Sequence, residues 1–379
     1  MRYSFGKDAW LLVAYSFVAW LGGNIVWFVQ PFYFRSLGLG YEEIGVIFSL
    51  STLVQAFALL LTGPIAVRFG YRRVILLAAI LFLTARLIQV FYPLFPLLLL
   101  SSVLLGFGMA LEWPAFMSLL SENAPEESRH YLFSLNSAIA TIGAAMGSFM
   151  GGLMPNYFGY RGTMLIATLL IPVQGLMVFL VSPVMERKGQ GVEFRKETLI
   201  KVLKFSLPTT LIGLGAGVTI PYMGLWFRTV FGTGLEEIGT LFAVQQFIMG
   251  LGTFLLPMIA DRIGSVKTIV TFNGSATALI VVLPFLPSFP LAAAVYIIRT
   301  ILMNIVNPIW DAFMMKFFRS GERSTALALR SFSWTVTFGV GQYLGGILFD
   351  RSLAMPFFIT GLLYGLSVFS FWVMFKEEE

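Results

Sequence analysis

The chain consists of long apolar runs separated by short polar breaks. Residues 44–66 and 132–160 carry no charged side chain, and residues 74–111 carry only Arg86. Each run has at least the roughly 20 residues that an α-helix needs to cross a hydrocarbon core of about 30 Å. Because backbone polar groups cannot stay unpaired in lipid, these runs predict membrane-spanning helices. The ten-residue alternation typical of a membrane β-barrel does not occur in them.

The hydrophobic pattern predicts about twelve spans. We place them at residues 9–33, 41–66, 73–92, 96–120, 130–155, 161–183, 205–230, 235–260, 266–285, 289–315, 324–349 and 354–375. Composition agrees with this reading, since hydrophobic residues make up 58% of the chain and charged residues 12%. Soluble domains average about 45–50% and 25%. The expected fold class is therefore an all-α integral membrane protein.

One offset relates the two halves of the chain. The segment Glu-Glu-Ile-Gly at residues 42–45 returns at residues 236–239, and this shift of 194 residues needs no gap from residue 38 to residue 152. The period is far longer than the 20–50 residues of solenoid repeats. We therefore infer a duplicated unit of six helices. The expected bundles are residues 1–183 and 205–379, joined by a polar cytoplasmic linker at residues 184–204.

The number of spans and the basic residues predict the orientation. Six spans per unit insert both bundles the same way up, as parallel repeats. With the N-terminus inside, 18 of the 25 Lys and Arg residues fall on the inner side and four fall in outer loops. The positive-inside rule then places both termini in the cytoplasm. We expect a multi-pass protein of a prokaryotic plasma membrane, and we do not expect this spread of charge to bind nucleic acid.

Candidate chemistry for an enzyme is missing from the sequence. The chain has no cysteine, and its one histidine, His130, falls in a predicted loop. Neither a metal-ligand cluster nor a nucleophile–base pair can be assembled from these residues. We therefore expect no metal, no cofactor and no enzymatic activity.

A motif between the second and third spans resembles the major facilitator superfamily of secondary transporters. The family pattern is Gly, three residues, Asp-Arg, one residue, Gly and then basic residues. Residues 63–73 match it except that Val67 replaces the aspartate, and the repeat copy at residues 257–267 keeps Asp261 but lacks the first glycine. The resemblance implies the two-bundle major facilitator fold and a cytoplasmic gate. The candidate gate residues are Gly63, Arg68, Gly70, Arg72, Arg129, Asp261, Arg262, Gly264 and Arg323.

The physical role of this loop has two interpretations. Gly70 and Gly264 are suited to a tight turn, and the arginines can bind lipid phosphate or a helix end. The loss of aspartate at Val67 shifts the expected latch to Asp261. In the alternative interpretation, the basic residues are only positive-inside anchors.

Five ionisable residues lie deep within predicted spans, where each charge costs at least about 2.5–3.5 kcal/mol unless it is paired or hydrated. Glu112 and Asp311 are the proton-coupling candidates, because desolvation favours a protonated carboxyl group. The candidate charge partners are Arg86, Arg299 and Arg330. We expect Arg86 to lie near Glu112, either as a coupling partner or as a static pair. Asp311 and Arg330 have matching depths, so we expect them to pair or to face each other.

Polar and aromatic residues share faces on several spans, which suggests a cavity. The resemblance places the corresponding helices around a central substrate cavity. The candidate lining residues are Ser16, Trp20, Asn24, Trp27, Gln55, Trp113, Asn136, Tyr222, Trp226, Gln245, Gln246, Asn304, Asn307 and Trp334. In the alternative interpretation, the aromatic residues belong to packed cores or to interfacial belts.

Small residues at helical spacing form a further stripe. Gly143, Gly147 and Gly151 follow one another at four-residue intervals, and Gly341 and Gly345 repeat the pattern. Such stripes let two helices approach closely. A glycine-rich fifth helix also resembles that of exporters in the superfamily, although Ser148 replaces the proline expected there. The stripe is explained either by close helix packing alone or by the glycine motif of exporters.

These observations predict a secondary transporter that works by alternating access. An aromatic cavity with few charges favours a small amphipathic or aromatic solute, and the resemblance favours proton-coupled export of the multidrug efflux type. The alternatives are an importer or uncoupled facilitator of a small polar solute, such as a sugar or peptide, and a non-transporting membrane receptor. The expected partners are the solute, protons and membrane lipids, and the expected oligomeric state is a monomer.

Overall fold

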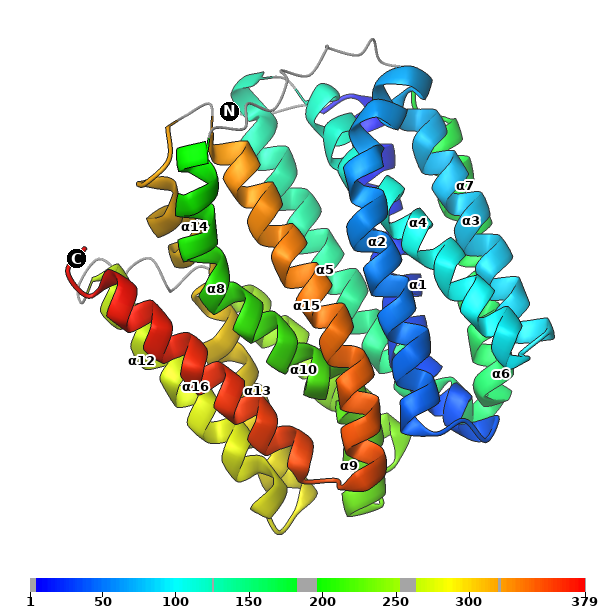
Figure 1. Ribbon diagram of the computed structural model, residues 1–379. Helices are drawn as coiled ribbons and strands as arrows, with labels where there is room; N and C mark the ends of the chain where they lie inside the picture. The colour runs from blue at the N-terminus through cyan, green and yellow to red at the C-terminus, as the bar shows by residue number, and fades with distance from the viewer. Residues whose placement is uncertain (1–4, 125, 183–195, 253–263, 320–321, 379) are drawn as a thin grey trace. The chain divides into compact units, whose positions relative to one another are not determined.

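The computed structural model describes residues 5–124, 126–182, 196–252, 264–319 and 322–378. Helix is the regular structure throughout these residues (Figure 1). The first repeat contains α1 (Lys7–Ser36), α2 (Tyr41–Phe69), α3 (Tyr71–Phe91), α4 (Phe95–Glu122), η1 (Glu126–Ser128), α5 (Arg129–Leu153), α6 (Pro155–Thr168) and α7 (Leu170–Phe179).

The second repeat is also helical, but short 3-10 turns and breaks interrupt its helices at other places than in the first repeat. It contains α8 (Lys196–Thr219), η2 (Ile220–Tyr222), α9 (Met223–Phe231), α10 (Leu235–Gly252), α12 (Ser265–Val282), η3 (Leu283–Phe285), α13 (Phe289–Ile305), α14 (Asn307–Met315), α15 (Arg323–Arg351) and α16 (Met355–Phe375).

The helices confirm the all-α membrane fold that the hydrophobic runs predict. Ten helical segments are long and apolar enough to cross a membrane. The predicted spans 161–183, 205–230 and 289–315 are each broken: α6 is followed by α7, α8 by η2 and α9, and α13 by α14. The two remaining predicted spans correspond to α15, a 29-residue helix, and to α10, whose described part ends at Gly252.

The chain forms two compact units. Unit 1 takes its residues from 1–39, 50–189 and 234–247, and unit 2 from 40–49, 190–233 and 248–379. Each unit thus holds most of one repeat together with the N-terminal part of one helix from the other repeat. That helix is α2 in the case of unit 2 and α10 in the case of unit 1, and the two begin at equivalent positions of the duplicated sequence.

The exchanged helix ends are held by polar contacts. In unit 2, the Asp350 carboxylate accepts hydrogen bonds from the backbone N–H groups of Tyr41 (3.1 Å) and Glu42 (2.8 Å). A carboxylate at this place satisfies free N–H groups and the positive end of the α2 dipole. In unit 1, Asn156, which is the repeat mate of Asp350, donates to Glu236 at 2.6 Å.

Each unit is built around a close helix pair, α1 with α5 and α8 with α15. A Cβ atom added to Gly147 would lie 2.4 Å from the carbonyl oxygen of Leu21, and one added to Gly341 would lie 2.3 Å from that of Leu214. Real side chains do not fit at such distances, so the glycine stripe lets the two backbones touch. Packing therefore accounts for the glycines at these positions.

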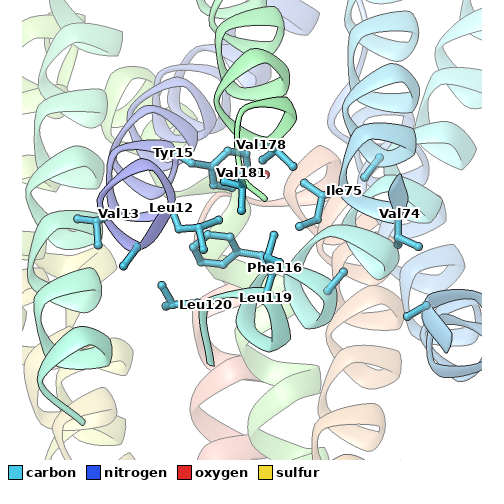
Figure 2. Packing of buried hydrophobic residues seen from close by; sticks show 14 of the residues in the cluster. Leu12, Val13, Tyr15, Val74, Ile75, Phe116, Leu119, Leu120, Val178 and Val181 are labelled. Atoms are coloured by element: carbon cyan, nitrogen blue, oxygen red, sulfur yellow. The ribbon is translucent and has the colours of Figure 1, made fainter. Parts of the chain in front are cut away.

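Repeat-related hydrophobic residues form the two cores. In unit 1, residues of α1, α3, α4 and α7 pack together, as Figure 2 shows for Leu12, Ile75, Phe116 and Val178. The core of unit 2 is more aromatic, with Phe205 stacked on Phe375 at 4.5 Å between ring centroids. Repeat mates fill corresponding places in the two cores, namely Ile75 and Ile269, Phe116 and Trp310, Leu119 and Phe313, and Leu120 and Met314.

Glycines form the turns that the repeat predicts. Gly70 precedes α3 with φ of 89°, and its mate Gly264 precedes α12 with φ of 86°. Gly38 and Gly232 form a second such pair, with φ of 90° and 65°. A side chain with a Cβ atom is strained in this left-handed region, which explains why the sequence keeps glycine at both copies of each turn.

Candidate functional site

The acidic centre of unit 1 is formed by α1 and α4. The Tyr15 hydroxyl donates a hydrogen bond of 2.5 Å to the Glu112 carboxylate. Tyr15 is 4% exposed. In the described part of the chain, Glu112 has no cation within ion-pair distance, so the tyrosine is its polar partner. A carboxyl group in this position can take up or release a proton without breaking an ion pair.

Aromatic side chains surround this carboxyl group. Tyr15 stacks on Phe116, with 5.1 Å between ring centroids, and Phe116 lies 6.2 Å from Trp113. Trp113 in turn meets Trp20 of α1 edge-on at 6.1 Å. Trp113 and Trp20 are 45% and 38% exposed, so part of each side chain is not covered by protein. The arrangement combines one carboxyl group with flat apolar surfaces, which suits an amphipathic or aromatic ligand.

Arg86 does not pair with Glu112, contrary to our expectation. Its Nη1 atom donates to Gln89 Oε1 at 2.8 Å, and Gln89 donates to Ser101 at 3.0 Å. Arg86 lies five residues from the end of α3 that joins α4, whereas Glu112 lies 17 residues from the adjoining end of α4. At about 1.5 Å per residue, their depths therefore differ by about 18 Å.

The charged centre of unit 2 is formed by α8, α14 and α15. Arg330 and Asp311 form the ion pair that their matching depths predict. Arg330 also donates from Nε to the Thr209 hydroxyl at 3.4 Å, and its guanidinium carbon lies 5.7 Å from the centre of the Trp310 ring. The Asp311 side chain is 46% exposed, whereas that of Arg330 is 17% exposed. The pair is therefore neutral as a unit and open on its carboxylate side.

The two centres occupy related places in the duplicated sequence. Phe116 and Trp310 are repeat mates, and each forms the aromatic wall beside its centre. Arg330 has Asn136 as its mate in unit 1, where the amide oxygen is buried and has no hydrogen-bond partner among the described residues. The position of Asp311 corresponds to Met117. One repeat thus carries a lone acid and the other carries an acid with its own counter-charge.

Tyr222 and Trp226 lie in the core of unit 2 instead of lining a cavity. They are 0% and 1% exposed. The Tyr222 hydroxyl donates to the Gln342 carbonyl at 2.5 Å, and the Trp226 indole N–H donates to the Leu353 carbonyl at 3.0 Å. Both polar groups are satisfied within the protein, and the rings are enclosed by other aromatic side chains such as Phe357.

The other predicted lining residues differ in their surroundings. Trp27 (47% exposed) packs against Phe242, and Trp334 (37% exposed) stacks on Phe338. Asn24 and Asn304 each donate to the carbonyl four residues earlier in their own helix, at 2.8 Å. The Ser16 hydroxyl and the Gln245 amide oxygen are buried without a partner in the described residues. Gln55 and Gln246 are partly exposed, and Asn307 is exposed.

The predicted gate residues are only partly described. Asp261 and Arg262 lie outside the described residues, and Gly63 has open space beside it. Arg72 donates to the Phe179 carbonyl at the end of α7 (2.5 Å), and Arg323 donates to the Phe318 carbonyl (3.3 Å). Arg68 lies over Phe69, at 5.4 Å from the ring centre, and Arg129 has a buried Nε atom without a partner among the described residues.

Arg299 is the remaining charged candidate. It is 2% exposed and donates from Nη2 to the Tyr364 hydroxyl at 2.8 Å. It has no acidic partner in the described part of the chain.

The sequence patterns did not identify four residues beside the two charged centres, namely Tyr15, Phe116, Thr209 and Trp310. The repeat offset, which pairs Phe116 with Trp310, was a signal that could have identified two of them.

A known family matches each half of the chain, in agreement with the duplicated sequence. The sequence pattern of the Major Facilitator Superfamily matches residues 12–209 and again residues 205–379. The chain belongs to the Major Facilitator Superfamily. It is a multi-pass integral membrane protein and a secondary transporter of small molecules, not an enzyme.

Relatives of this chain are named for different transported or resisted compounds. The chain is 24% identical to multidrug resistance protein 2 of Bacillus subtilis, over 97% of this chain and 96% of that protein. It is 23% identical to the quinolone resistance protein NorA of Staphylococcus aureus, over 93% of each chain. It is also 25% identical to the 4-hydroxybenzoate transporter PcaK of Pseudomonas aeruginosa, over 59% of this chain and 51% of that protein.

Solved structures share the fold. The crystal structure of the nucleoside transporter NupG superposes with a TM-score of 0.81 at 16% identity, covering 98% of this chain and 100% of that chain. A bacterial homologue of the human lysosomal transporter Spinster superposes with a TM-score of 0.78 at 15% identity, covering 97% and 96%. This likeness supports the major facilitator fold predicted from the sequence.

Proposed function

We propose that this transporter exports a small amphipathic or aromatic solute across the plasma membrane in exchange for protons. The observation that carries the proposal is the Glu112 carboxyl group, which is hydrogen-bonded to Tyr15 and lies beside accessible tryptophan rings. Protonation of Glu112 removes a negative charge next to the proposed binding surface. Proton binding and solute binding are therefore coupled through one side chain.

Glu112 is a better candidate for the coupling residue than Asp311. Asp311 forms an ion pair with Arg330, and loss of its charge would leave the Arg330 guanidinium without its partner. Glu112 has a neutral hydroxyl as its partner, so a change in its protonation breaks no ion pair. We assign Asp311 and Arg330 the role of a fixed neutral pair beside the transport pathway.

The names of two relatives support the choice of solute. The B. subtilis protein is named for multidrug resistance and the S. aureus protein for quinolone resistance, and both align over nearly the full chain. Partly exposed Trp20 and Trp113 offer apolar faces against which a flat ring can stack. A lone carboxylate beside such faces favours neutral or positively charged solutes over anions.

The test is transport by purified protein in vesicles that carry a pH gradient. Replacing Glu112 with Gln keeps the size of the side chain but removes its titration, so we expect pH-driven transport to be lost while downhill exchange of labelled solute continues. Glu122→Gln is the matched control, because Glu122 lies on the same helix and is exposed at its end. Full pH-driven transport by the Glu112→Gln protein would reject the proposal.

Uptake of an aromatic acid is a second candidate function. Arg330 lies against the Trp310 ring, and a guanidinium group beside an aromatic ring can bind an aromatic carboxylate. PcaK, which matches part of the chain, is named as a 4-hydroxybenzoate transporter. Saturable uptake of a labelled aromatic acid, with no transport of cationic dyes, would favour this function over export.

We further propose the arrangement in which this transport takes place. Residues 1–183 and 205–379 form two bundles that move against each other, residues 184–204 link them, and both termini are cytoplasmic. The basic residues near Gly70 and Gly264, together with Asp261, control the cytoplasmic gate. The working form is a monomer. The distribution of Lys and Arg supports the cytoplasmic termini, and the matching turns at Gly70 and Gly264 support a gate loop in each repeat.

A further inference from the structure

Arg299 is a charged residue in the middle of the membrane-spanning part of unit 2, twelve residues before Asp311. It lies ten residues into α13, which places it about 15 Å from the end of that helix. Its partner Tyr364 lies nine residues into α16, whose end is on the same side of the membrane. Both side chains are enclosed, with 2% and 1% of their surfaces exposed.

The contacts of Arg299 leave its charge uncompensated. Its guanidinium carbon lies 5.3 Å from the centre of the Tyr364 ring, and its Nη2 atom donates to the Tyr364 hydroxyl at 2.8 Å. The Nε–H group is buried and has no acceptor in the part of the chain that the structure describes. No carboxylate of the described residues pairs with it. An unpaired charge in this environment is costly, and a cation–π contact offsets only part of the cost.

The hydrogen-bond pattern also lacks acceptors at this point. The Tyr364 hydroxyl oxygen accepts from Arg299, which leaves its own hydrogen free to donate. Tyr296, one turn before Arg299 on α13, is buried beside the same two groups and is also a neutral hydroxyl. The Arg299 Nε–H group is thus left without an acceptor among the described residues, next to a hydroxyl that can donate and beside a positive charge. A small anion accepts from the Nε–H group and balances the charge at once, and the Tyr364 hydroxyl can donate to it, whereas a water molecule leaves the charge unbalanced.

We infer that Arg299 and Tyr364 bind a small monovalent inorganic anion, such as chloride, between α13 and α16. The site is separate from Glu112 and from the Asp311–Arg330 pair. Bound anion holds the two helices together and completes the electrostatic balance of unit 2. Its presence does not depend on the transported solute or on the direction of transport.

The test measures chloride binding to the purified full-length protein. Radioactive chloride, assayed by equilibrium dialysis in a gluconate buffer, should bind saturably at one ion per chain, and chloride should raise the melting temperature above that in gluconate. Arg299→Gln should abolish this binding. Arg161→Gln is the control, because Arg161 is exposed and contacts Phe91, and binding by this variant should be unchanged.

Milder variants keep the test decisive if Arg299→Gln does not fold. Tyr364→Phe keeps the aromatic ring but removes the donor, and should weaken chloride binding at least severalfold. Arg299→Lys keeps the charge but loses the Nε donor, and should weaken it as well. Absence of saturable chloride binding to the unmodified protein would overturn the inference, as would unchanged binding in Tyr364→Phe. Neither result would affect the proposed role of Glu112.

Discussion

At the scale of single residues, the hydrogen bond from Tyr15 governs how readily Glu112 holds a proton. A donor to a carboxylate favours its ionised form, and hydrogen bonds to charged groups contribute about 1.5–3 kcal/mol. Tyr15→Phe keeps the ring that stacks on Phe116 but removes the donor. We expect the pH of half-maximal transport to rise by about one unit or more, measured as solute flux over a series of pH values.

Tyr33→Phe is the matched control for this variant. Tyr33 is on the same helix, and its hydroxyl donates to the backbone carbonyl of Gln89 and not to a carboxylate. The pH midpoint of transport should therefore stay where it is in the unmodified protein. A midpoint that moves equally in both variants would show that Tyr15 acts through packing of α1, not through Glu112.

At the scale of helices, the glycine contacts set the distance between paired elements. The space beside Gly341 is filled by backbone atoms of α8, including the Gly217 Cα atom 2.9 Å from an added Cβ. Backbone cannot move aside as a flexible side chain can. Gly341→Ala should therefore lower the stability of unit 2, on the order of 1–3 kcal/mol, which thermal unfolding of the purified protein would detect as a lower melting temperature.

The control for this variant lies in the same unit. An added Cβ atom at Gly365 of α16 meets no atom within 4 Å. Gly365→Ala should be neutral or slightly stabilising, because alanine favours helix more than glycine does. Equal losses of stability in the two variants would argue that helix flexibility, and not the contact between α8 and α15, makes glycine necessary at position 341.

At the scale of the whole molecule, the proposed topology can be tested directly because the chain contains no cysteine. Glu126 is exposed before α5, and Tyr157 is 73% exposed near the start of α6. In intact cells, a membrane-impermeant maleimide should label the Tyr157→Cys protein and spare the Glu126→Cys protein. Lysed cells should label both. The opposite pattern in intact cells would invert the orientation that Lys and Arg predict.

The large-scale features of this molecule were predictable from the sequence. Long uncharged runs locate helices because lipid forces the backbone to satisfy its own hydrogen bonds. The 194-residue offset located the turns at Gly70 and Gly264, whose φ values differ by 3°. The ion pair of Asp311 and Arg330 followed from counting residues along their helices. Each of these features can be read from residue spacing, either along a helix or between the two repeats.

The details of the site were less predictable, because they depend on which helix faces meet. Aromatic residues at helical spacing lie in a core in the case of Tyr222 and Trp226, and at accessible positions in the case of Trp20 and Trp113. The pattern within one helix is the same in both cases. Tyr15 was missed because it directly precedes Ser16, on which the face of α1 was defined. Only the packing of α1 against α4 identifies it.

The difference between the two repeats at their charged centres has a consequence for energetics. Of the two membrane-embedded carboxyl groups in the described residues, Asp311 is neutralised by Arg330 and Glu112 is left to exchange a proton, so the proposed mechanism predicts one proton per solute molecule. A pH difference of one unit acting alone would sustain about a tenfold concentration ratio of a neutral solute. Steeper accumulation would have to draw on the membrane potential.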